Sequence, residues 1–126
     1  MQHRRLERNR RVKYAEMGYS LLLKAIGSTP KLRLMDIFLT NPYFDFSKQE
    51  LAIELGMSKQ TLYKNFKDLE QLGAVVASRR IGRATLYRID KGHPLVQELN
   101  RLVLETSRHI AEGQMKRNIA PIAVKT

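Results

Sequence analysis

Apolar side chains follow a helical repeat in five stretches of this sequence and alternate along one further stretch. The stretches with helical spacing are residues 4–26, 30–41, 47–56, 59–72 and 94–112. The alternating stretch runs from Val75 to Ile89 and is interrupted by Gly82, whose backbone freedom suits a tight turn. The pattern therefore predicts a mainly α fold with a small β-hairpin.

Capping and stop signals support these helix boundaries. Thr29 can cap a helix whose first position is Pro30, where a missing N–H costs nothing. Ser47 begins the sequence Ser-Lys-Gln-Glu, which has the spacing of a capping box. Gly56 ends that helix, and Ser58 begins the next one after a single intervening residue. Two helices joined by so tight a turn predict a helix-turn-helix.

The helix over 59–72 has the polarity of a helix that enters the major groove of DNA. Its expected apolar stripe is Leu62, Phe66, Leu69 and Leu72, and its two acids lie in the last turns. Gln60, Tyr63 and Lys64 are the candidates for contacts with base edges. Lys59 and Lys67 are the candidates for phosphate contacts. An ordinary solvated helix face would show the same pattern. The hairpin that follows is therefore needed to distinguish a DNA-contacting helix from a solvated one.

The tip of the hairpin carries three arginines, Arg79, Arg80 and Arg83, and no acid falls between Val75 and Ile89. Crowded like charges repel one another in an isolated fold. A phosphate backbone or a minor groove beside the preceding helix would accept this charge and offset the repulsion. The hairpin is therefore predicted to be a wing that contacts DNA.

The net charge of +11 is concentrated at the two ends of the chain. Residues 1–13 hold six basic residues and one acid, and residues 114–126 hold three basic residues and no acid. Such placement favours a polyanion partner, with nucleic acid ahead of a membrane, although solvated basic tails remain the alternative. Arg4, Arg5 and Arg8 are therefore expected to contact DNA.

Motifs for catalysis or metal binding are missing from the sequence. It contains no cysteine, which excludes disulfide scaffolds and zinc-thiolate sites and fits an intracellular protein. His3, His93 and His109 are far apart, and His93 is expected to cap the helix that begins at Pro94. No phosphate loop, nucleophile elbow or apolar run long enough for a membrane is present. We therefore expect no metal, no cofactor and no enzymatic activity, and a cytoplasmic protein associated with the nucleoid.

The order of these segments resembles a known family. A helix, a Gly-Met-Ser turn, a second helix, the segment LEQLGAVVASRRIGRATLYRI and then HPLVQEL are similar to the winged helix-turn-helix transcription regulators of the ArsR/MarR-like type. The resemblance covers roughly residues 30–112, and its specific part is the wing Arg-Arg-x-Gly-Arg followed by a strand that contains a tyrosine. It implies a prokaryotic regulator, archaeal sources included, that binds operator DNA as a homodimer. The metal-sensing role of some members does not carry over, because their cysteines are missing here.

The apolar stripe of the last helix is wider than one small domain needs. It either covers the domain's own core or pairs with a second subunit, and pairing is the favoured interpretation. The expected dimer contacts are Leu21, Leu95, Leu99, Leu102, Val103 and Ile110. Gly113 is expected to end the helix.

These elements predict a winged helix-turn-helix flanked by N- and C-terminal helices. The expected parts are a basic arm (1–13), an N-terminal helix (14–28), a winged helix-turn-helix core (29–92), a C-terminal dimerisation helix (93–113) and a flexible basic tail (114–126). The predicted function is sequence-specific binding of double-stranded DNA by a homodimeric transcriptional regulator. One alternative is an architectural or plasmid-maintenance protein with little sequence preference. Another is a winged-helix module for protein interactions, against which the arginine-rich tip argues.

Overall fold

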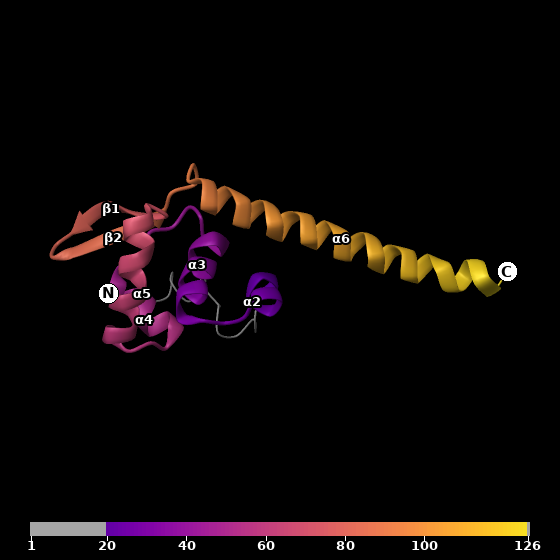
Figure 1. Ribbon diagram of the computed structural model, residues 1–126, viewed down its shortest axis with the longest axis horizontal. Helices are drawn as coiled ribbons and strands as arrows, with labels where there is room; N and C mark the ends of the chain where they lie inside the picture. Colours follow the sequence, from indigo (N-terminus) through magenta and orange to yellow (C-terminus); the bar gives the residue numbers. More distant parts are fainter. Residues whose placement is uncertain (1–19, 126) are drawn as a thin grey trace.

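The computed structural model describes residues 20–125, and it describes the side chains of residues 20–115. In chain order the elements are α2 (Leu21–Ile26), α3 (Pro30–Thr40), α4 (Lys48–Leu55), α5 (Lys59–Leu72), β1 (Val75–Ile81), β2 (Ala84–Ile89) and α6 (Pro94–Lys125). A small helical body carries the hairpin at one end, and α6 projects from the other end (Figure 1). The predicted fold class, a winged helix-turn-helix with flanking helices, is confirmed.

The core lies where α3, α4 and α5 meet the hairpin. Three phenylalanines with no exposed surface, Phe38, Phe46 and Phe66, form its centre. The rings of Phe38 and Phe46 meet edge to face with centroids 5.7 Å apart, and Phe66 meets Tyr87 in the same way at 4.7 Å. Such pairs add to the gain from burial alone, so α5 and β2 are held in a defined relation.

The turn between α4 and α5 follows from local capping. The expected capping box at Ser47 is present, because the Glu50 N–H donates to Ser47 Oγ and the Ser47 N–H donates to Glu50 Oε1, both at 3.1 Å. Gly56 ends α4 with φ +62°, a left-handed conformation that suits glycine. Ser58 then caps α5 by accepting the N–H of Thr61 at 3.1 Å. The predicted helix-turn-helix is thus built by contacts among neighbouring residues.

The hairpin is antiparallel, and a third segment supports it. Val75 pairs with Ile89 and Ile81 with Ala84, with an irregularity in register between Ala77 and Arg79. Phe46, in the connector before α4, forms an isolated bridge to Tyr87, and each backbone N–H donates to the other's carbonyl at 2.8 Å. This bridge holds the base of the hairpin against the helical body.

Two helix boundaries differ from the sequence expectation. Ser20 has an extended backbone and caps α2, so the helix expected over 4–26 does not continue through this residue. Gly113 does not end the last helix, because α6 continues to Lys125 and includes the segment expected to be a flexible tail. A glycine inside a helix costs only about 1 kcal/mol relative to alanine, and the good helix formers Glu112 and Gln114 flank this one. The expected arm and most of the expected first helix, including Tyr14 and Met17, lie outside the described residues.

His93 links α5 to α6 and caps the latter, as expected. The Leu95 N–H donates to His93 Nδ1 at 3.1 Å. Because Nδ1 accepts, the ring proton is on Nε2, which lies 2.6 Å from the Leu72 carbonyl oxygen and donates to it.

Leu72 itself is exposed, so its expected place in the apolar stripe of α5 is wrong.

Candidate nucleic-acid interface

The two sides of α5 are divided as the sequence predicted. Leu62, Phe66 and Leu69 are buried against the body. The exposed side carries all five candidate DNA contacts of this helix, which are Lys59, Gln60, Tyr63, Lys64 and Lys67. The buried stripe fixes the rotation of the helix, so the candidate side chains point away from the core.

Cations of neighbouring helices pair with the two acids at the carboxyl-terminal end of α5. Lys31 of α3 lies 2.5 Å from Asp68, and Lys48 of α4 lies 3.8 Å from Glu70. The hydrogen bond and the charge of Lys31 lower the pKa of Asp68. Pairing compensates the negative charge at this end of α5, so the surface near the helix retains a net positive potential.

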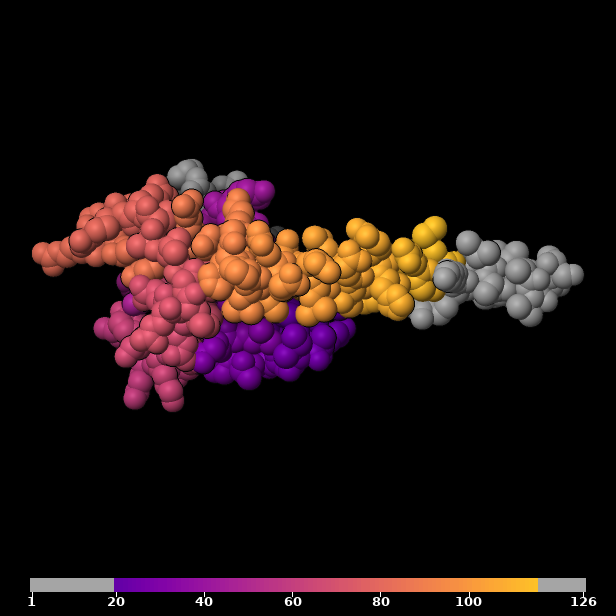
Figure 2. Space-filling view, turned by 45° about the horizontal axis from the view of Figure 1, so that its top comes forward, coloured from indigo at the N-terminus to yellow at the C-terminus, as the bar shows by residue number. Residues whose placement is uncertain are grey.

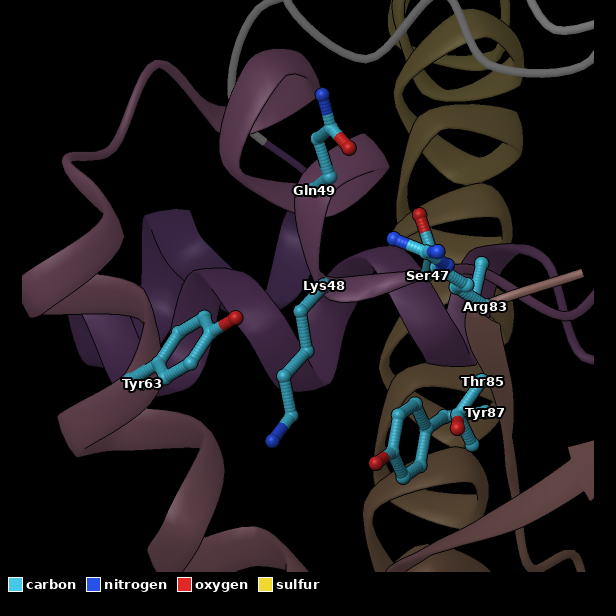
Figure 3. Close-up of a pocket in the computed structure, with 8 residues that line it drawn as sticks. Ser47, Lys48, Gln49, Tyr63, Arg83, Thr85 and Tyr87 are labelled. Carbon is cyan, nitrogen blue, oxygen red and sulfur yellow. The ribbon is translucent and has the colours of Figure 1, made fainter.

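A groove separates α5 from the wing, and it brings two of the candidate DNA contacts together. Figure 3 shows residues that line it, and its volume is about 310 Å³. It is lined by Ser47, Lys48, Gln49, Tyr63, Arg83, Ala84, Thr85 and Tyr87. Tyr63 comes from α5 and Arg83 from the wing, so two residues 20 positions apart in the sequence face one hollow. The amino terminus of α4, where helix N–H groups favour anions, forms a third wall.

Lys48 was not among the residues selected from the sequence, and the structure places it in this groove. Its Nζ atom lies 4.8 Å from the ring centroid of Tyr63, 4.9 Å from that of Phe66 and 5.4 Å from that of Tyr87. Figure 3 shows its side chain between Tyr63 and Tyr87. Cation–π attraction thus holds a positive charge between α5 and β2. Its position directly after the cap Ser47 is visible in the sequence, but the aromatic neighbours come from other elements.

Arg79 differs from the other two wing arginines. Its Nε atom lies 2.9 Å from Asp45 Oδ2, and the Ser78 hydroxyl donates to the same oxygen at 3.1 Å. Partial burial alone would raise the pKa of Asp45, but the hydrogen bonds from Arg79 and Ser78 and the charge of Arg79 outweigh it and lower that pKa. The sequence indicated a wing without a neutralising acid. The structure differs, because Asp45 in the connector before α4 neutralises Arg79.

Arg80 and Arg83 remain exposed, and neither has an ion-pair partner among the described residues. These two arginines therefore carry the uncompensated charge of the wing. Arg4, Arg5 and Arg8 lie outside the described residues, so their contacts with DNA stay a prediction.

The candidate dimer contacts fall into two groups. Leu99 packs against the protein's own core, next to the buried Val96, and Leu21 and Val103 are half-buried. Leu95, Leu102 and Ile110 are exposed. The α6 helix packs against α2 along its first part and then continues beyond it (Figure 2). One part of the wide stripe therefore covers the protein's own core, and another part is left exposed. Pairing of the exposed part with a second subunit stays a prediction.

Residues 20–125 contain no group of three or more His, Cys, Asp or Glu residues placed to hold a metal ion. No helix in the same range is both long and apolar enough to span a bilayer.

Comparisons with known proteins agree with this geometry. The family described as an HTH domain matches residues 31–82, from α3 to the tip of the hairpin. Residues 31–82 are therefore similar to helix-turn-helix domains. A comparison with curated proteins found no match.

Two solved structures share the fold. The "possible transcriptional regulator from Methanosarcina mazei Go1" superposes with a TM-score of 0.50 and 15% identity, over 71% of this chain and 78% of that chain. M. tuberculosis Rv0081 superposes with a TM-score of 0.50 and 22% identity, over 75% of this chain and 89% of that chain. At these identities the likeness shows the fold alone.

Proposed function

We propose that this protein binds double-stranded DNA in a sequence-specific manner, as a homodimeric prokaryotic transcription regulator of the winged, ArsR/MarR-like type. The supporting observation is the groove in which Tyr63 of α5 and Arg83 of the wing face one hollow. In this proposal α5 lies in the major groove and the wing follows the adjacent backbone or minor groove. The protein would act by binding DNA rather than by catalysis, at the nucleoid in the cytoplasm.

Charge placement supports DNA over a protein partner. The exposed side of α5 and the wing tip carry Lys59, Lys64, Lys67, Arg80 and Arg83, while the nearby acids are paired. A phosphate backbone accepts such a surface through several separate contacts, each releasing counterions. Polar side chains in the middle of the cationic surface, such as Gln60, are suited to base edges.

The open part of α6 supports a homodimer. Leu102 and Ile110 are 48% and 39% exposed, and a spacing of eight residues puts them on the same side of the helix. A helix of 32 residues is about 48 Å long, so α6 extends past the body and offers this side to a second copy. Two copies related by a two-fold axis would place two α5 helices on successive half-sites.

The test compares binding to DNA from upstream of the protein's own gene with binding to scrambled DNA at matched salt. Gln60→Ala or Lys64→Ala should cost about 1–3 kcal/mol on the upstream site and much less on scrambled DNA. Equal losses on both would favour the architectural alternative. Absence of binding to either duplex would favour the module for protein interactions.

A further inference from the structure

Burial holds the base of the wing but not its outer part. Val75, Leu86 and Ile89 at the base of the hairpin are buried, whereas residues 77–84 are all exposed. Figure 1 shows the tip of the hairpin extending beyond the helices. An isolated two-stranded hairpin is only marginally stable in water. Apolar packing therefore fixes the base of the wing, and the direction of the tip depends on other contacts.

An extra residue interrupts β1 where the exposed part begins. Ala77 pairs with Tyr87 and Arg79 pairs with Leu86, so over this step β1 contains one residue more than β2. The extra residue is Ser78. Such an insertion is a β-bulge, which bends the strand and increases its twist. The conformation of this bulge therefore sets the angle between the base and the tip of the wing.

One carboxylate of the connector before α4 binds both residues at the bulge. Asp45 Oδ2 accepts hydrogen bonds from the Ser78 hydroxyl at 3.1 Å and from Arg79 Nε at 2.9 Å, and Asp45 Oδ1 accepts one from Arg79 Nη2 at 3.4 Å. The two donors of a planar guanidinium fix its orientation on a carboxylate, which a single ammonium cannot do. The Asp45 side chain is only 17% exposed, so the bulge is bound to a partly enclosed group of the body.

Asp45 is itself held in place by its neighbours in the chain. Phe46 has no exposed surface, and its backbone pairs with that of Tyr87. Ser47 then caps α4 through the capping box with Glu50. A residue directly before these two cannot move independently of the helical body. The Asp45 carboxylate is therefore a fixed anchor for the bulge.

We propose that Asp45 is a positioning residue that directs the wing toward DNA. It holds the bulge at Ser78 and Arg79, and the direction of the bulge places Arg80 and Arg83, which lie beyond it, near the phosphates next to α5. Arg79 then acts within the protein, as the partner of Asp45, and not as a DNA contact. The inference rests on the proposed DNA binding, but the direction of the wing can also be measured in the free protein.

Charge alone predicts the opposite effect for Asp45→Asn. This change makes the protein more positive and frees Arg79 for a phosphate, so DNA binding should tighten and the slope of log affinity against log salt should steepen by about 0.9. If Asp45 directs the wing, binding should instead weaken several-fold. The slope should also flatten, because Arg80 and Arg83 are no longer held near phosphates. The sign of the change therefore distinguishes positioning from simple neutralisation.

Fluorescence anisotropy with the full-length protein on upstream and scrambled DNA measures both quantities. Ser78→Ala removes one of the hydrogen bonds without changing the charge, and it should cause a smaller loss in the same direction. Arg79→Lys keeps the charge but loses the planar pair of donors, so it should also weaken binding. The matched control is Asp68→Asn, which removes an acid whose ion pair with Lys31 does not involve the wing. This control should not weaken binding.

Residual dipolar couplings of the free, isotope-labelled protein measure the direction of the wing without DNA. In Asp45→Asn the couplings of residues 77–84 should change, while those of α3 and α5 should stay as in the wild type. Tighter DNA binding by Asp45→Asn, or unchanged couplings in its wing, would overturn the proposal. A wild type that binds neither duplex would refute the proposed function, and the couplings alone would then decide whether Asp45 directs the wing.

Discussion

Arg80 and Arg83 are the wing residues whose removal should change how DNA binding responds to salt. Both are exposed and lack an ion-pair partner among the described residues, whereas Arg79 is held by Asp45. The hairpin is maintained by backbone pairing and by the bridge between Phe46 and Tyr87. Alanine at positions 80 and 83 should therefore leave the fold intact and remove two cations from the proposed interface.

The size of the effect follows from counterion release. Each phosphate neutralised contributes about 0.9 to the slope of log affinity against log salt, so two lost contacts should reduce the slope by about 1.8. When salt rises from about 50 to 200 mM, the affinity of both proteins should fall. The factor by which the affinity of the double variant falls should be roughly twelve times smaller than the factor for the wild type. Because phosphates carry no sequence information, the change should be the same on upstream and scrambled DNA.

Fluorescence anisotropy on labelled duplexes over a salt series measures this slope. The matched control is Arg101→Ala with Arg108→Ala, which removes the same charge from α6, where each arginine pairs with a glutamate one turn away. The control should keep the wild-type slope. An unchanged slope in the wing variant, or equal flattening in both, would refute the assignment of the wing to phosphate contacts.

Two further predictions concern assembly and acid sensitivity. Leu102→Glu with Ile110→Glu should halve the mass measured by sedimentation and preserve the fold. The control Leu104→Glu changes an exposed leucine on the opposite side of α6 and should preserve the dimer. A wild-type protein that sediments as a monomer at micromolar concentration would exclude the dimer. Hydrogen bonds lower the folded-state pKa of Asp45, so its contribution to stability is present above the unfolded-state pKa, about 3.9, and is lost as the pH falls through the folded-state value. The difference in urea stability between wild type and Asp45→Asn should therefore shrink as the medium is acidified below about pH 4, and a difference that stays constant would contradict this role.

Features that depend on residues close together in the chain could be predicted from the sequence. The caps at Thr29, Ser47 and Ser58 and the helix end at Gly56 are present as expected, because each depends on a hydrogen bond or a backbone angle set within a few residues. The apolar repeat of α5 likewise indicated which side of the helix faces the core. These local signals were sufficient to predict the helix-turn-helix and the hairpin that follows it.

The end of α6 shows where local signals are too weak. A glycine at position 113 is compatible with a helix end and with a helix interior, and the difference amounts to about 1 kcal/mol. The helix continues through this glycine to Lys125. The sequence also did not show which part of the apolar stripe on α6 is buried, because the spacing of Leu99 and Leu102 does not indicate which of them meets the core.

Contacts between distant segments were decided by the tertiary structure alone. The partner of Arg79 is 34 residues away in the chain, and the aromatic neighbours of Lys48 belong to α5 and β2. The groove shared by Tyr63 and Arg83 also exists only because separate elements pack together. The sequence determined which residues could carry charge and which could be buried. Which charges remain uncompensated depends on the packing of elements, because an ion pair requires its partners to lie within a few ångströms regardless of their separation along the chain.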